Sequence, residues 1–204
     1  IVVLMSCALA ACGSTGGADG SSVSSTVPVG GLPSSSSPVT TAHPVARRVV
    51  LLGDSLARET APYLQTLLVD KVFVPLFFVG AAPCDWLDVD LQATADSVVV
   101  VSFNGNSLTP CMADGAGGYL SGQALIDRYR TDLRTLIGRA QAVGADVIMV
   151  GQPIRRSDIP GNEAVAGLNV LYRNLVEELD LGYVDGGAAV EDAQGGFTER
   201  LPCL

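Results

Sequence analysis

Histidine and basic residues are scarce in this sequence. One histidine, His43, occurs among 204 residues, and 12 lysines and arginines stand against 21 aspartates and glutamates, which gives a net charge of −9. The few cations are scattered, which excludes the basic footprint of a nucleic-acid-binding protein. The sequence also lacks a cluster of metal-ligating residues, a phosphate-binding loop and a dinucleotide fingerprint, so it implies no metal and no cofactor.

An apolar run that ends in small residues opens the sequence, IVVLMSCALAAC. It is typical of the apolar and cleavage regions of a secretory signal whose basic region is missing, so we interpret the sequence as partial at its front. Leu9-Ala10-Ala11-Cys12 resembles a bacterial lipobox, which predicts Cys12 as a lipid anchor in the membrane. A plain signal peptide with a chance cysteine, or a short transmembrane anchor, is the alternative. Each of these predicts export.

Residues 13–46 consist mainly of serine, glycine, threonine and proline. Such a composition buries too little apolar surface to offset the entropy of ordering, so we expect a disordered tether. The remaining residues, 47–204, have the length of one ordinary domain, and 48% of the whole chain is apolar. The sequence therefore predicts a signal at 1–12, a tether at 13–46 and a single folded domain.

Short apolar runs alternate with helical stretches in the folded part, which is the pattern of βαβ units. Near-continuous hydrophobicity is typical of parallel strands that are covered on both faces. The sequence predicts an α/β fold, a three-layer α/β/α sandwich with a parallel, flavodoxin-like five-stranded sheet. The expected strands span 48–53, 72–79, 97–103, 146–152 and 182–186, and the expected helices span 56–68, 121–143 and 162–179. Ligands bind beyond the carboxyl ends of such strands.

The first predicted strand ends in Gly53-Asp54, and Ser55 follows at the start of a predicted helix. A helix start offers unpaired N–H groups and a positive dipole end, which suits a nucleophilic serine beside a forming oxyanion. The same place suits a serine that only caps the helix, and Asp54 could be the cap equally well. This stretch alone leaves both roles open.

The strings GDSL, at 53–56, and FNGN, at 103–106, each follow a predicted strand. Together they resemble the SGNH hydrolases, also called the GDSL esterase/lipase superfamily, over residues 47–204. In that family the serine of the first block is the nucleophile. A glycine of the second block and the asparagine of the third donate to the oxyanion, and an Asp-x-x-His near the C-terminus completes the machinery.

The resemblance implies that Ser55 is the nucleophile, that the Asn106 side-chain amide donates to the oxyanion and that Asp54 shapes the turn. Gly80, after the second strand, is the candidate backbone donor, or else only a turn glycine. The family's third block, Gly-x-Asn-Asp, is replaced here by the residues NGNS at 104–107. This replacement leaves open what holds Asn106, and a plain turn is the alternative interpretation of the stretch.

Cys84 and Cys111 each lie beside one of the two loops assigned to the oxyanion hole. In an exported protein we expect this pair to form a disulfide, worth roughly 3 to 4 kcal/mol in the chain-entropy model. The neighbouring Asp85 and Trp86 are candidates for the mouth of the site, although a lone tryptophan more often packs in a core. The stretches CDW and FNGNSLTPCM also resemble exported actinobacterial SGNH proteins. For Cys203 we expect a partner beyond residue 204.

A serine hydrolase needs a base, most often a histidine oriented by a carboxylate. His43 lies in the tether, where neither position nor rigidity suits that role. The sequence ends at GGFTERLPCL, shortly after the last predicted strand. We therefore expect the Asp-x-x-His block to follow residue 204, and a pseudoenzyme without that block is the alternative. Asp185 does not match the motif and is left unassigned.

These features together predict a monomeric, exported serine esterase or acyltransferase, anchored through Cys12. Its expected substrate is an acyl ester of the envelope or the extracellular space, on a glycan or a lipid. The rival interpretation is a non-catalytic surface lipoprotein that uses the same pocket to bind a glycan or an acyl ligand.

Overall fold

The computed structural model describes residues 46–154, 159–188, 190–192, 194 and 196–198. Cys12, the tether up to residue 45, His43 and Cys203 lie outside the described residues. The described part contains one sheet and three long helices. The strands are β1 (Arg48–Gly53), β2 (Val72–Phe77), β3 (Ser97–Ser102), β4 (Asp146–Gly151) and β5 (Gly182–Asp185). The helices are α1 (Ser55–Leu67), α2 (Gly122–Ala142) and α3 (Ile159–Leu179), with short 3-10 helices η1 (Pro83–Trp86) and η2 (Pro110–Met112).

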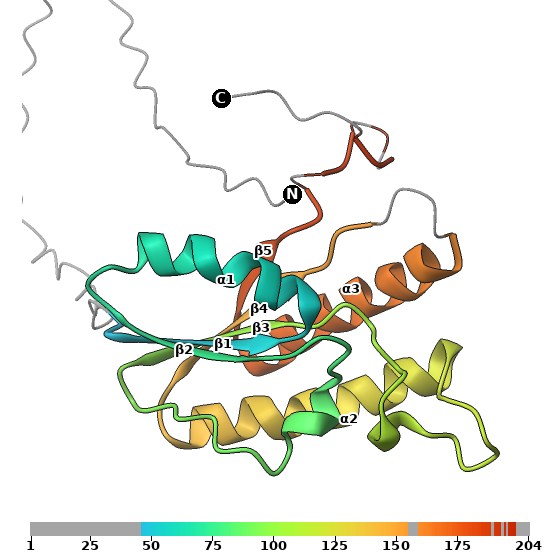
Figure 1. Cartoon of the computed structure of the whole chain (residues 1–204), viewed down its shortest axis with the longest axis horizontal. Helices are drawn as coiled ribbons and strands as arrows, with labels where there is room; N and C mark the ends of the chain where they lie inside the picture. The colour runs from blue at the N-terminus through green and yellow to red at the C-terminus, as the bar shows by residue number, and fades with distance from the viewer. Residues whose placement is uncertain (1–45, 155–158, 189, 193, 195, 199–204) are drawn as a thin grey trace, which may run out of the picture. The chain divides into compact units, whose positions relative to one another are not determined.

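The sheet is parallel throughout, and its strand order is β2-β1-β3-β4-β5. Helix α1 lies on one face, whereas α2 and α3 lie on the other (Figure 1). The predicted three-layer α/β/α sandwich with a five-stranded parallel sheet is thereby confirmed. No helix within the described ranges is both long and apolar enough to span a membrane.

The strand order explains why the helices divide between the two faces. Helix α1 connects β1 to β2, which lies at one edge of the sheet. The chain then returns to the other side of β1, where it adds β3, β4 and β5 in turn. Because crossover connections between parallel strands are right-handed, reversing the direction moves the later helices to the opposite face. The reversal point lies between β1 and β3, which is where open sheets of this kind bind ligands.

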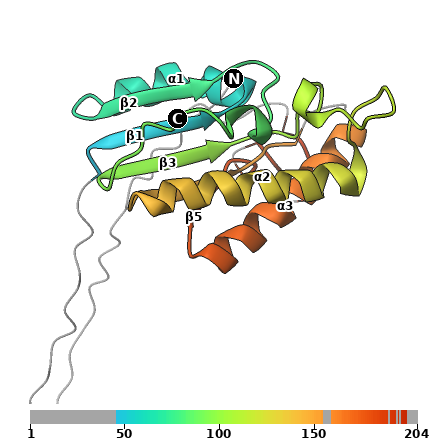
Figure 2. The same cartoon turned by 90° about the horizontal axis from the view of Figure 1, so that it is seen from below.

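The main hydrophobic core fills the space between the sheet and helices α2 and α3. A second, smaller cluster lies under α1 and is formed by Leu51, Ala57 and Ala61. The expectation that the strands are covered on both faces is therefore met at β1 but not at β3 and β4. Those two strands alternate largely between buried and half-buried residues in the described structure, because α1 packs mainly over β1 and β2 and reaches β3 only at Val100. Figure 2 shows the sheet from the side of α2 and α3, with α1 behind β2.

The second strand ends two residues before its predicted end. The predicted strand continued to Val79, but β2 ends at Phe77, and Phe78 and Val79 are exposed. The N–H of Ala81 donates to the Phe78 carbonyl at 3.3 Å, and Gly80 has a φ of +82°, so the chain turns here. A positive φ costs glycine little, which explains how an apolar run is ended so early.

Replacing Gly53 by alanine tests the packing at the end of β1. An added Cβ would overlap the carbonyl oxygen of Ser102 and come within 2.6 Å of the Ala57 Cβ. We expect Gly53→Ala to lower the free energy of unfolding by about 2 to 3 kcal/mol, as overpacking does. The comparison of urea unfolding curves for variant and wild type measures this change.

The matched control is Gly138→Ala in the interior of α2, where an added Cβ meets nothing within 4 Å. Alanine is a better helix former than glycine, so this control should raise stability by about 0.5 to 1 kcal/mol. A neutral Gly53→Ala would show that β1 and α1 are less closely packed than described.

Candidate active site

The last residues of β1, β2 and β3 lie side by side at the carboxyl edge of the sheet. Gly53 pairs with Phe77 on one side and with Ser102 on the other. One predicted site residue follows each of these strands: Ser55 at the start of α1, and Gly80 and Asn106 in the loops after β2 and β3. The topology therefore brings the three predicted blocks to one place.

Asp54 is completely buried and lies at the centre of this place. Its Oδ1 accepts a hydrogen bond from the Leu56 N–H at 3.0 Å, and its Oδ2 accepts from the Asn104 N–H at 2.7 Å and from the Asn106 Nδ2 at 2.9 Å. A carboxylate that accepts several N–H bonds is stabilised in its charged form, which compensates for its burial. Asp54 thus ties the start of α1 to the loop after β3.

Ser55 is the first residue of α1, and Asp54 is its N-cap. Of the two cap candidates that the sequence left open, the structure therefore selects the aspartate. The Ser55 hydroxyl has no hydrogen-bond partner among the described residues, and the side chain is half-buried. Ser55 therefore lies in the first turn of α1, where the helix N–H groups lack partners within the helix.

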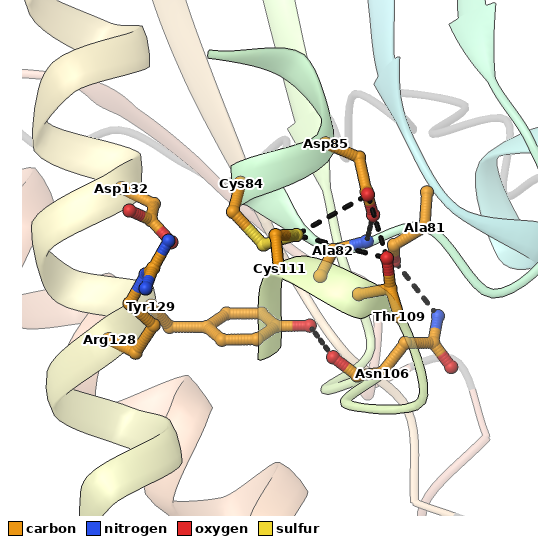
Figure 3. The surroundings of a disulfide bond; sticks show 10 residues. All are labelled: Ala81, Ala82, Cys84, Asp85, Asn106, Thr109, Cys111, Arg128, Tyr129 and Asp132. Carbon is orange, nitrogen blue, oxygen red and sulfur yellow. Dashed lines mark hydrogen bonds and ion pairs between the residues drawn. A yellow bond between two sulfur atoms is a disulfide. The ribbon is translucent and has the colours of Figure 1, made fainter. Parts of the chain in front are cut away.

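Asn106 connects all three loops through one side chain. Its Nδ2 donates to the Asp54 Oδ2. The same nitrogen donates to the Ala81 carbonyl at 3.2 Å, which is the bond drawn in Figure 3. Asp54 and Ala81 are the immediate sequence neighbours of Ser55 and Gly80. These two bonds identify what holds Asn106 in the absence of the family's usual third block. Because the amide has two hydrogens, both are engaged, and donation to a substrate oxygen requires the longer bond to Ala81 to be released.

The loop after β2 is braced by Asp85. Its Oδ2 accepts from the Ala82 N–H at 2.8 Å, and its Oδ1 accepts from the Thr109 hydroxyl at 2.7 Å. These bonds fix the backbone just beyond Gly80, whose own N–H has no partner among the described residues. Asp85, a candidate for the mouth of the site, thus links the loop after β2 to the loop after β3.

The predicted disulfide between Cys84 and Cys111 is present, with the two Cα atoms 6.1 Å apart. It joins η1 to η2, so the loops after β2 and β3 are linked covalently as well as through Asp85 (Figure 3). The Cys111 sulfur lies 3.3 Å from the Asp85 Oδ1. Since both sulfurs are bonded to each other, this cysteine and aspartate cluster offers no thiolate to a metal ion.

Two buried tyrosines, which the sequence assigned no role in the site, hold the loop after β3 from below. The Tyr129 hydroxyl, on α2, donates to the Asn106 carbonyl at 2.9 Å, and the Tyr172 hydroxyl, on α3, donates to the Phe103 carbonyl at 2.6 Å. Burial raises the pKa of both, and the negative charge of Asp54 raises each further. A buried tyrosine needs an acceptor for its hydroxyl. A tyrosine on the apolar face of a predicted helix was therefore the sequence signal for a hydrogen bond inside the core.

Two buried oxygens near the ends of β3 and β4 have no hydrogen-bond partner within the described part of the chain: Asn104 Oδ1 and Gln152 Oε1. The Gln152 amide nitrogen donates to the Ser102 hydroxyl at 3.3 Å and to the Val150 carbonyl at 2.6 Å. A buried acceptor without a donor costs free energy of folding, so a donor placed at either oxygen would stabilise the protein. The sequence gave no indication of Gln152.

Two further residues have structural rather than catalytic surroundings. Trp86 is buried and packs against the Phe78 ring, with centroids 5.3 Å apart, which agrees with packing in a core. The Asp185 carboxylate accepts from the Gly187 and Ala188 N–H groups and lies 3.4 Å from Arg173, so it shapes the turn after β5.

Neither a protein-family model nor a curated protein matches this sequence. Solved structures, in contrast, resemble it in fold. A candidate acylhydrolase from Bacteroides fragilis is 18% identical, with 75% of this chain and 74% of that chain covered and a TM-score of 0.52.

Two further structures agree with that likeness. A candidate lipolytic protein of the G-D-S-L family from Desulfitobacterium hafniense is 12% identical, with 75% of this chain and 85% of that chain covered and a TM-score of 0.55. An acetylxylan esterase from Geobacillus stearothermophilus is 16% identical, with 70% and 77% covered and a TM-score of 0.51. At such identities the likeness establishes the fold.

Tyr129→Phe should change how stability depends on alkaline pH. Tyrosines of the unfolded chain ionise near pH 10, whereas buried Tyr129 keeps its proton to higher pH. Its contribution is therefore full below about pH 10 and is lost as the pH rises further. We expect the free energy of unfolding of Tyr129→Phe to fall less steeply above that pH, by up to about 1.4 kcal/mol per pH unit. Urea unfolding at a series of alkaline pH values measures both slopes.

The matched control is Tyr119→Phe, because Tyr119 is 46% exposed. This control should retain the slope of the wild type. Identical slopes for Tyr129→Phe and the wild type would contradict the burial of the hydroxyl.

Proposed function

We propose that this chain, which has the fold of the SGNH hydrolases, is an exported serine esterase or acyltransferase with Ser55 as its nucleophile. The observation that supports this most is the hydrogen bonding of Asn106 to the neighbours of Ser55 and Gly80. These bonds link the segments that contain the proposed nucleophile and the three proposed oxyanion donors, which supports a role in acyl transfer.

In the proposed reaction the Ser55 Oγ attacks the carbonyl carbon of an ester while a base accepts its proton. The carbonyl oxygen becomes an oxyanion that accepts from the Ser55 N–H, the Gly80 N–H and the Asn106 amide. The tetrahedral intermediate then collapses and expels the alcohol, which takes up the proton. Water, or a second alcohol in a transferase, attacks the acyl-enzyme by the same route and releases Ser55.

The proposed substrates are acyl esters of the envelope or the extracellular space, reached by a protein anchored through Cys12. The structural likeness to an acetylxylan esterase supports the ester class of this proposal. The anchor itself rests on the sequence of the first twelve residues.

A fluorophosphonate probe tests the nucleophile directly, because it phosphonylates activated serines. We expect labelling of the protein encoded by the complete gene, and we expect its loss in Ser55→Ala. Ser121→Ala is the control, because Ser121 is an exposed serine that also precedes a helix. Labelling that survives in Ser55→Ala, or no labelling of the complete protein, would favour a ligand-binding protein without catalysis.

Asn106→Ala should lower kcat for a p-nitrophenyl ester about 10²- to 10³-fold, as the loss of an oxyanion donor does. The change in KM should be small, because the oxyanion exists only in the transition state. Asn174→Ala, at an exposed position of α3, serves as the control. A drop confined to KM would assign Asn106 to substrate binding instead.

We further propose that the base is a histidine outside these 204 residues, since His43 precedes β1 and belongs to the Ser/Gly/Pro-rich segment. The 204-residue chain should therefore turn over a p-nitrophenyl ester at a small fraction of the rate of the complete protein, and His43→Gln should change neither rate. Ester turnover that depends on His43 would refute this assignment.

A further inference from the structure

An open groove of about 510 Å³ lies between α1 and the edge strand β2. Its lining from β2 consists of alternate residues, which point to the same face of the sheet: Phe73, Pro75 and Phe77. Its lining from α1 consists of Arg58, Ala61, Pro62 and Gln65. Figure 1 shows α1 on the face of the sheet above β1 and β2. The groove is apolar along most of its length.

The chain segment that supplies this groove is rich in exposed apolar side chains. Among the described residues, six of the twelve exposed large hydrophobic side chains fall between positions 63 and 79, the stretch that includes the end of α1 and all of β2. They are Tyr63, Leu67, Val69, Val72, Phe78 and Val79.

Arg58 is the one charged residue of the lining. It is exposed and forms no ion pair or side-chain hydrogen bond with the described part of the protein. In a chain with a net charge of −9, an unpaired cation beside an apolar groove is a position suited to a single anionic group. The combination fits an amphiphile with one negative end and an apolar tail, and it lacks the several polar groups that a glycan needs.

The groove begins beside the candidate active site. Arg58 follows Ser55 by three residues and so lies on the same side of α1, one turn along. Phe77 pairs with Gly53 in the sheet and precedes Gly80 by three residues. From Phe77 to Phe73 the floor spans four strand residues, roughly 13 Å, directed away from the site.

We propose that this groove binds a fatty acyl chain, with the carboxyl end at Arg58 beside Ser55 and the tail along Pro62 and Pro75 toward Phe73. The proposal rests on the proposed function only in its consequence, which is that Ser55 acts on esters of fatty acids rather than of acetate. The binding itself depends on the groove alone.

Calorimetric titration of the full-length protein with dodecanoate, below its micelle concentration, tests the binding. The wild type should bind dodecanoate more tightly than hexanoate. Gln65→Trp fills the far end of the groove. It should weaken the binding of dodecanoate at least tenfold and leave the binding of hexanoate unchanged. Thr66→Trp is the matched control, because Thr66 is the next residue, is exposed and does not line the groove; its affinities should equal those of the wild type.

The charge is tested with Arg58→Gln and a pair of ligands that differ only in the head group. Dodecanoate should bind this variant about three- to tenfold more weakly than it binds the wild type, whereas dodecanol should bind both equally. Equal losses for both ligands would show that the carboxylate does not lie at Arg58 and would overturn the assigned orientation.

Absence of dodecanoate binding to the wild type, or equal effects of Gln65→Trp and Thr66→Trp, would overturn the proposal. These outcomes are separate from the fate of the proposed function. Dodecanoate binding without fluorophosphonate labelling of Ser55 would indicate a fatty-acid-binding protein without esterase activity. Labelling without binding would leave a serine esterase whose acyl chain lies elsewhere.

Discussion

The buried carboxylate of Asp54 is the interaction on which the rest of the site depends. It is a charge inside the protein, and it is tolerated because N–H groups from the start of α1 and from the loop after β3 converge on it. These N–H groups are in turn held in place, because moving any of them would leave the buried carboxylate without a hydrogen bond. The electrostatic requirement of one side chain therefore fixes the positions of Ser55 and Asn106 together, and damage to Asp54 would affect folding and the site alike.

The surrounding structure holds the same loops from several directions. The Tyr129 and Tyr172 hydroxyls support the loop after β3, and Asp85 and the disulfide join it to the loop after β2. Each of these contacts joins residues more than 20 positions apart. Rigid placement of donors before substrate arrives is what makes an oxyanion hole effective, because no reorganisation is then needed during the reaction.

The sequence predicted those parts of the structure that depend on local pattern. Apolar runs and helical periodicity identified every strand and long helix to within a few residues, and the strings around Ser55 and Asn106 fell where the strands end. The disulfide was also predicted, because both cysteines flank those loops. The cap was not decided in advance, since Asp54 and Ser55 have similar local preferences and only the donors from another strand distinguish them.

Contacts between distant residues escaped sequence reasoning. Tyr129 occupies an apolar helix stripe, and nothing near it in the sequence names the Asn106 carbonyl as its acceptor. Gln152 and the groove along β2 likewise exist only once the strands are ordered in space. The early end of β2 depends on how Gly80 turns, which apolar composition does not reveal.

The bond from Asn106 to the Ala81 carbonyl has a further consequence for selectivity. In the resting protein this carbonyl is an internal competitor for the amide hydrogen that the proposed oxyanion would accept. A neutral ester oxygen is an acceptor of similar strength to the competitor and gains little by displacing it, whereas a full negative charge gains much more. In the proposed reaction the amide would therefore donate to the transition state rather than to the bound ester, and it would favour reaction over ground-state binding.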